Sequence, residues 1–380
     1  MCISYIYYIY IYILEKYIIF WVIRLQGRRI QKVGPSTLTV SLPSSWTKEA
    51  GLRKGDLVFY VPQSDGSLKL RARESDEREK KVKEFVVNSD LCDREGLLER
   101  IIVGNYLLGH DIISIVSSKR ISNSHSEEIR RISRKLIGLG IIEETPIRII
   151  LQCSIETSKF PIDMVVRRLY AIASTIHKEA IQALCEMKME LAEEAIRREE
   201  DADMMYWLAS RLLYSAQNSR DIAEKIDLNR HNILNLRMLV GFLERMADWG
   251  EKIGKNVILI EKKGIGIGEP IIEGVYQLSE KAYTICVNAM ESVFTGDIKI
   301  ANIAIENYKK KIEQEEEKLV QDLPLHLPDS EVASNLRHIL WGIRRIAELG
   351  AEIAELSLNQ ALDRSTKLCK GLDNSNILNK

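Results

Sequence analysis

The sequence contains none of the short motifs by which most enzymes are recognised. It has no Walker lysine, no GxSxG elbow, and six histidines without HxxxH or HExxH spacing. The glycine-rich run Gly264–Gly268 follows an apolar segment, but its third glycine comes one residue too early for a GxGxxG nucleotide loop. We therefore expect no enzymatic activity. We also expect His177 and His338 to be packed or capped rather than to bind a metal.

Cysteine is sparse and scattered. The six cysteines form no CxxC pair, which excludes a zinc knuckle and a redox dithiol. With no export signal in view, we expect buried thiols in a reducing cytoplasm. The net charge gives no information about binding partners, because 54 Lys and Arg balance 54 Asp and Glu. The basic residues are unevenly placed, however: seven of them and a single acid lie between Arg24 and Lys54, which suggests a front part with its own task.

Residues 1–23 form a hydrophobic, low-complexity extension rich in isoleucine and tyrosine. Its length is that of a membrane span. Glu15 and Lys16 lie in its middle, where one charge costs about 2.5–3.5 kcal/mol on insertion scales. We interpret the extension as a mis-assigned start or a disordered arm and expect no stable membrane insertion. A membrane anchor is the alternative.

Changes in residue pattern divide the remaining chain into five parts, so we expect a multidomain, mainly helical protein. A β-rich domain (24–75) and a small α/β connector (76–158) precede two three-helix bundles (159–263 and 264–363) and a disordered tail (364–380). In the connector the pattern predicts strands at Glu84–Asn88, Ile112–Ser117 and Ile147–Cys153, and helices at Arg94–Leu108 and Glu127–Leu139.

The two bundles are predicted from an internal repeat. Helical periodicity runs from Pro161 to Leu362, with breaks near Met187–Glu190, Asn218–Asn229, Gly264–Pro270, Gly296–Asp297 and Pro324–Pro328. The run Asn235-Leu236-Arg237 recurs one hundred residues later, and so do Arg245, Ala247, Gly250 and Ile253. Seven matches in one register indicate a duplicated unit of three helices, joined at Gly264–Pro270.

The front domain has a definite order of short elements. A basic strand and a small-residue turn precede a strand at Ser36–Leu42, a short helix that ends at Gly51, and strands at Asp56–Val61 and Leu68–Ala72. So short a unit buries little core alone and is expected to pair with a second copy. Across residues 28–73 this order resembles the AbrB/SpoVT family of swapped-hairpin DNA-binding domains, although Gly34-Pro35-Ser36-Thr37 departs from the family's usual turn.

That resemblance implies a homodimer with interlocked hairpins and a basic face on DNA. Lysine and arginine supply sequence-independent affinity for phosphate groups. By position, the candidate DNA contacts are Arg28, Arg29, Lys32 and Lys48. The same fold also serves purely for dimerisation, so the DNA contact stays one of two interpretations.

Pairs of acids spaced four residues apart occur in the helical half. Glu199 and Asp203 form one pair, and Glu244 and Asp248 form another. Residues i and i+4 share a helix face, so two such helices side by side would bring together four carboxylates suited to hard or borderline cations. From about residue 162 to 362 the sequence resembles PhoU, a negative regulator of phosphate uptake built of two three-helix bundles with E(D)xxxD motifs. The resemblance implies divalent or iron cations at these residues.

The second repeat keeps fewer of these acids. It offers Glu313 and Glu317, but the counterpart of Glu244 is Arg344 and that of Asp248 is Glu348. An arginine among carboxylates replaces the charge of a cation with its own. We therefore predict metal in the first bundle only, with Glu313, Glu317 and Glu348 as weaker candidates.

Together the two resemblances predict a phosphate-uptake regulator that binds DNA and contacts the ATPase of a phosphate ABC transporter. Coupling between the bundles and the DNA-binding domain would require differential affinity for two states. The alternative is a dimeric adaptor that never touches DNA and controls the transporter through its helical bundles. A metal-dependent hydrolase is disfavoured, because no histidine stands three residues from a motif acid.

Overall fold

The computed structural model describes residues 27–62, 66–72, 84–156, 159–229, 232–327 and 329–362. The chain forms two compact units, Met1–Lys81 and Val82–Lys380, and each is treated by itself. The predicted extension (1–23) and tail (364–380) lie outside the described residues. Within the described part of the chain, no helix has the length and apolar character needed to cross a membrane.

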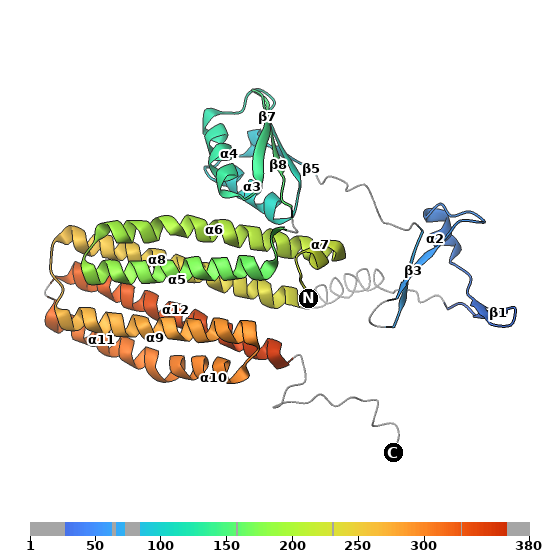
Figure 1. Cartoon of the computed structure of the whole chain (residues 1–380). Helices are drawn as coiled ribbons and strands as arrows, with labels where there is room; N and C mark the ends of the chain where they lie inside the picture. Colours follow the sequence, from blue (N-terminus) through green and yellow to red (C-terminus); the bar gives the residue numbers. More distant parts are fainter. Residues whose placement is uncertain are drawn as a thin grey trace, which may run out of the picture. The chain divides into compact units, whose positions relative to one another are not determined.

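The first unit consists of two hairpins and a short helix (Figure 1). Strands β1 (Gln31–Val33) and β2 (Thr37–Thr39) pair antiparallel around Gly34, whose φ of +73° suits glycine. Helix α2 (Ser44–Glu49) follows, and strands β3 (Phe59–Pro62) and β4 (Leu68–Arg71) form the second antiparallel pair. The predicted order of elements is confirmed, although β2 and β3 are shorter than the alternating sequence suggested.

This unit has no core of its own among its described residues 27–62 and 66–72, none of which is buried. Its large apolar side chains face outward instead; those most exposed are Ile30, Val33, Leu38, Val40, Leu57, Tyr60 and Leu68. Exposed apolar residues on both hairpins are unusual for an isolated soluble domain and mark an interaction surface.

The second unit begins with the α/β connector. Strands β5 (Glu84–Asn88) and β6 (Ile112–Val116) run parallel, joined by α3 (Leu97–Leu107). Helix α4 (Asn123–Lys135) leads to the antiparallel strands β7 (Leu139–Glu144) and β8 (Arg148–Cys153), and the sheet order is β5-β6-β8-β7. The core forms between sheet and helices, from residues such as Leu98, Ile102, Ile113, Ile129 and Leu151.

One connector prediction is wrong. The helix predicted over residues 127–139 begins earlier, at Asn123, where the Ser122 hydroxyl accepts a hydrogen bond from the His125 amide. It also ends earlier, because the chain turns at Gly138 with φ +78° and continues as β7. Strand β7 was therefore missed in the sequence.

The helical half contains the six predicted long helices, and every predicted break is confirmed. The elements are α5 (Ile162–Glu186), α6 (Met189–Asn218), the short α7 (Arg220–Lys225), α8 (Ile233–Lys263), α9 (Glu269–Thr295), α10 (Ile298–Asn307), the π-helix η5 (Tyr308–Ile312), α11 (Glu313–His326) and α12 (Ser330–Leu362). Gly264 and Gly296 end α8 and α9 in the left-handed conformation, where glycine carries no Cβ penalty.

These helices form two sets of three. Helices α5, α6 and α8 pack on one another, and so do α9, the α10–η5–α11 run, and α12 (Figure 1). Two glycines reveal the same packing in both sets. A Cβ on Gly250 would lie 2.6 Å from Ile176 Cγ2 and 3.3 Å from the next backbone nitrogen, and a Cβ on Gly350 would meet the equivalent atoms of Ile285 and Cys286 at 3.0 and 3.2 Å.

The two bundles meet mainly along α8 and α12. Trp249 and Trp341 pack edge to face with ring centroids 5.0 Å apart, and a Cβ on Gly342 would lie 2.9 Å from Ile253. A second contact joins α5 to α9, where buried His177 shares a 2.8 Å hydrogen bond with Ser279. His177 is therefore packed and partnered, as predicted, whereas His338 is exposed on α12.

Candidate functional site

The predicted acidic residues of the first bundle lie on two helices that pack closely together. Glu199 and Asp203 lie one turn apart on α6, and Glu244 and Asp248 lie one turn apart on α8. A small residue makes the close approach possible, since a Cβ on Gly254 would lie only 3.2 Å from the Ala192 carbonyl oxygen. All four carboxylates are partly buried.

The electrostatics show that these four groups influence one another. Burial raises the pKa of Glu199 to about 7, and the charge of Asp203 adds to the effect. Burial likewise raises the pKa of Glu244 to about 7 and that of Asp203 to about 6, with Asp248 as the main neighbouring charge in both cases. The pKa of Asp248 is also raised by burial. A cation close to these partly buried carboxylates would stabilise their ionised form.

A fifth carboxylate belongs to the same group. Glu251 raises the pKa of Glu199, Asp203 and Asp248 after the larger effect of burial, and its own carboxylate lies 2.6 Å from the Lys255 ammonium. The sequence analysis missed it, although positions 244, 248 and 251 share one face of a helix. We call Glu199, Asp203, Glu244, Asp248 and Glu251 the acidic cluster.

The acidic cluster has donors suited to a hard cation, but it is not a formed coordination sphere. Searching the described residues for three or more His, Cys, Asp or Glu side chains able to hold one metal ion finds no such group. The raised pKa values and the lack of a formed metal site are compatible, because repulsion between carboxylates acts over a longer distance than a metal–oxygen bond. The residues to which metal binding was assigned therefore lie near one another without converging on a point.

The second bundle differs at the matching place. Arg344 lies among carboxylates, with Nη2 2.5 Å from Glu313 Oε1 and Nη1 3.2 Å from Glu316 Oε2. Glu348 forms its ion pair with Arg345 on the same helix. Glu317, which the sequence paired with Glu313, is exposed, and the buried carboxylate is Glu316.

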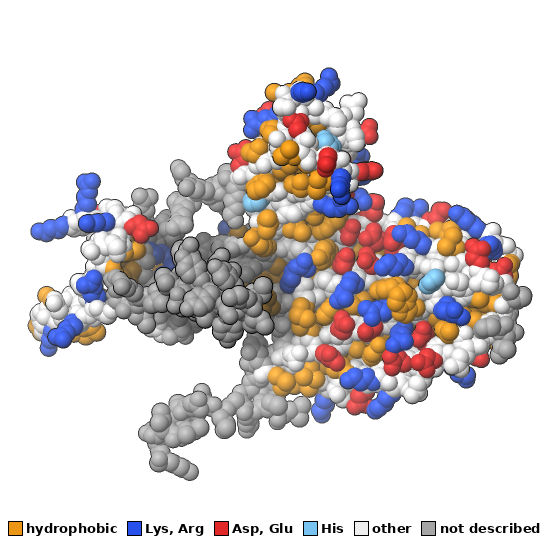
Figure 2. Space-filling view, turned by 180° about the vertical axis from the view of Figure 1, so that it is seen from behind, with side chains coloured by type: hydrophobic (Ala, Val, Ile, Leu, Met, Phe, Trp, Pro, Cys, Tyr) orange, Lys and Arg blue, Asp and Glu red, His pale blue; other side chains and the backbone are white. Residues whose placement is uncertain are grey.

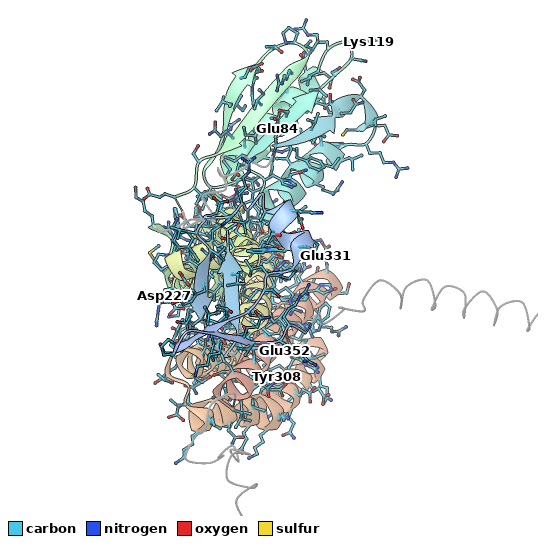
Figure 3. All side chains as sticks on the ribbon, turned by 90° about the vertical axis from the view of Figure 1, so that its right-hand side faces the viewer. Glu84, Lys119, Asp227, Tyr308, Glu331 and Glu352 are labelled. Carbon is cyan, nitrogen blue, oxygen red and sulfur yellow. The ribbon has the colours of Figure 1, made fainter. Side chains whose placement is uncertain are left out.

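A π-helix, Tyr308–Ile312, directly precedes these acids. Because a π-helical turn contains more residues than an α-helical turn, Glu313 and all the residues after it are rotated together relative to α10. Ile176 of the first bundle corresponds to Ile285 of the second, a shift of 109 residues. The same shift makes Tyr308 and Ile312 the counterparts of Glu199 and Asp203. Tyr308, labelled in Figure 3, hydrogen-bonds with Arg344. The second bundle thus has an arginine, a tyrosine and an isoleucine where the first has acids.

The candidate DNA contacts are all exposed on the first unit. Arg28 and Arg29 precede β1, Lys32 lies within it, and Lys48 lies in the last turn of α2. Figure 2 shows lysine and arginine side chains standing out from this unit. The glycine-rich run Gly264–Gly268 is the loop between α8 and α9, as expected for a joint.

Comparisons with known proteins point to the helical half. The PhoU domain family matches residues 166–257, the segment that holds the acidic cluster. The structure is similar to PhoU from Pseudomonas aeruginosa, at 16% identity and a TM-score of 0.43, over 52% of this chain and 93% of that one. It is also similar to the phosphate transport system regulatory protein PhoU from Streptococcus pneumoniae, at 16% identity and a TM-score of 0.45, over 53% and 94% of the two chains. No curated protein matches the sequence.

Proposed function

We propose that this protein is a non-enzymatic regulator of phosphate transport whose helical half acts on the ATPase of a phosphate ABC transporter. The observation that carries the proposal is the PhoU domain match over residues 166–257. The second bundle repeats the packing of the first at Gly250 and Gly350, so a module of two PhoU-like bundles continues beyond the matched segment.

Deleting the gene tests this proposal in cells. A negative regulator predicts a higher initial rate of phosphate uptake in phosphate-replete medium, restored to the wild-type rate when the full chain is supplied from a plasmid. The matched control is uptake of an unrelated solute by another ABC transporter, which the deletion leaves unchanged. Phosphate uptake that is equal with and without the gene contradicts the proposal.

For the first unit we propose pairing with the same unit of a second chain. Seven large apolar side chains on or beside its two hairpins are more than half exposed, and none of its described residues is buried. Burying each such side chain contributes about 1.5–3 kcal/mol, which is the stabilisation that this unit lacks alone. Leu38→Lys, at the centre of β2, is expected to turn a dimer into a monomer in analytical ultracentrifugation, whereas Lys69→Gln leaves the dimer intact.

Within that dimer, we propose that Arg28, Arg29, Lys32 and Lys48 contact DNA. Pairing doubles the number of exposed cations on the unit, and phosphate contacts give affinity that falls steeply with salt. The test is titration of the full chain with its own upstream DNA and with a scrambled duplex at two salt concentrations. Tighter binding to the upstream DNA that is lost in Arg28→Ala/Arg29→Ala supports the contact. Absent or salt-independent binding contradicts the DNA contact and favours the alternative, a dimeric adaptor that does not bind DNA.

The acidic cluster is where we propose that the first bundle holds a divalent or iron cation. Its five carboxylates are partly buried and mutually repelling, and an O-rich donor set suits such ions. Glu199 and Asp203 from α6 and Glu244 and Asp248 from α8 would hold it. The cation supplies charge that joins the two helices, and Arg344 supplies that charge in the second bundle.

A further inference from the structure

One lysine of the connector lies at the edge of the acidic cluster. Lys135, the last residue of α4, places its ammonium nitrogen 2.9 Å from Glu200 Oε1 on α6. Glu200 directly follows Glu199 in the chain. The same ammonium opposes the rise in pKa that burial and neighbouring carboxylates cause at Glu199 and Asp203. Figure 2 shows acidic side chains on the helical half beside the connector.

This ion pair differs from an ordinary surface pair. An exposed Lys–Glu pair contributes little by itself, and the Glu200 side chain is 60% exposed. Lys135, however, is 28% exposed and acts on three carboxylates, two of which belong to the acidic cluster. The bases beside Glu244 and Asp248 come from α8 itself, whereas Lys135 comes from another part of the fold.

The docking of the connector fixes the place of Lys135. Buried Arg211 of α6 donates hydrogen bonds to the carbonyl oxygens of Tyr106, at 2.7 Å, and His110, at 3.0 Å, where α3 ends. The Tyr106 hydroxyl donates in turn to the Ile137 carbonyl at 2.9 Å, two residues beyond Lys135. Helix α6 therefore holds the end of α4 in place through α3. Lys135, at that end of α4, contacts α6 beside the acidic cluster.

We infer that Lys135 is the resident counter-ion of the acidic cluster and competes with a cation bound there. The inference rests on the cation-binding function proposed above. A divalent cation at Glu199 and Asp203 repels the ammonium group, so cation binding weakens the contact between α4 and α6. By linkage, that contact weakens cation binding by the same factor. The connector, which precedes the helical half and follows the β-rich unit in the chain, thus responds to occupation of the cluster.

Titration of the full chain with Mn²⁺, followed by calorimetry, tests the competition. Lys135→Gln is expected to bind Mn²⁺ about tenfold more tightly than the wild type, within the range usual for coupled sites. Arg134→Gln is the matched control: it removes the same charge one residue away, but Arg134 is exposed and bonds to the Arg130 carbonyl of its own helix. Equal or weaker Mn²⁺ binding by Lys135→Gln than by the wild type overturns the inference.

A second measurement works without metal. In EDTA, Lys135→Gln lowers the unfolding temperature, and this loss is expected to shrink by about half or more when Glu199→Gln is also present, since the effects of charges that interact with one another are not additive. Equal losses in both backgrounds overturn the counter-ion role. A clear coupling together with no Mn²⁺ binding by any variant keeps the counter-ion role and removes the proposed cation site, so the two failures are distinguishable.

Discussion

Replacing Arg344 by methionine perturbs the feature that most clearly separates the second bundle from the first. Its guanidinium bridges two carboxylates: Nη2 lies 2.5 Å from Glu313 Oε1, and Nη1 lies 3.2 Å from Glu316 Oε2. The Glu316 side chain is only 10% exposed, so the substitution leaves a nearly buried carboxylate without its cation. Methionine fills much of the same volume, which limits the change to the lost charge.

The expected cost lies between two limits. Removing one partner of a fully buried pair costs about 3–5 kcal/mol, whereas exposed pairs contribute about 0–1 kcal/mol. Because the Arg344 and Glu313 side chains are 29% and 50% exposed, we expect Arg344→Met to cost about 2–3 kcal/mol of unfolding free energy. For a unit of the size of Val82–Lys380 that lowers the unfolding temperature by about 3–5 °C.

Differential scanning calorimetry of four chains measures the effect: wild type, Arg344→Met, Glu316→Gln/Arg344→Met and Glu317→Gln. The double variant is expected to recover most of the loss, because the unpaired charge is gone. Glu317→Gln is the control, an exposed neighbour expected to change stability by less than about 0.5 kcal/mol. No recovery in the double variant, or a loss in Glu317→Gln as large as that in Arg344→Met, refutes the assigned register and the role of Arg344.

Three further predictions follow from single residues. Burial lowers the pKa of His177 to about 4 from 6.5, so stability falls as pH drops from 6.5 toward 4, by up to about 3 kcal/mol. His177→Gln is expected to flatten that slope in thermal melts, whereas His338→Gln keeps it. Burial raises the pKa of Glu199 from 4.5 to about 7, so its ionisation lowers stability as pH rises from 4.5 to 7, and the full loss is present above pH 7. Glu199→Gln is therefore expected to stabilise the EDTA-treated protein at pH 8 but not below pH 4.5. A difference in unfolding temperature between Glu199→Gln and the wild type that is the same at both pH values contradicts this. Gly250→Ala is expected to cost about 1–3 kcal/mol by overpacking Ile176, while Gly241→Ala in the same helix, with no contact closer than 3.9 Å, is expected to stabilise by up to about 1 kcal/mol.

The sequence predicted most of the helical half because its signals are local. Gly264 and Gly296 end helices through their own backbone freedom, and Asp297 caps the next helix with its side chain. The repeat was visible because close packing at Gly250 and Gly350 permits no side chain. The pairing of acids on α6 and α8 followed from the same helical period.

The errors arise where several backbone paths suit the same residues. Glu316 and Glu317 stand three and four residues after Glu313, so both share its side of an α-helix and the sequence does not distinguish the buried one, Glu316, from the exposed one. Strand β7 was missed because the apolar spacing of α4 continues through Leu136 and Leu139 across the turn at Gly138. Lys135 is brought to Glu200, beside the acidic cluster, by contacts between parts of the chain far apart in sequence, which no local pattern records.

The claim that the helical half acts on a phosphate transporter is tested most directly by binding of the purified full chain to the ATPase subunit of the phosphate ABC transporter from the same organism. Biolayer interferometry with an immobilised ATPase subunit measures this binding, and the ATPase of an unrelated ABC transporter serves as the control. The account predicts saturable binding to the phosphate ATPase alone, retained in Arg28→Ala/Arg29→Ala because the first unit is not involved. Binding no stronger than to the control ATPase contradicts the account.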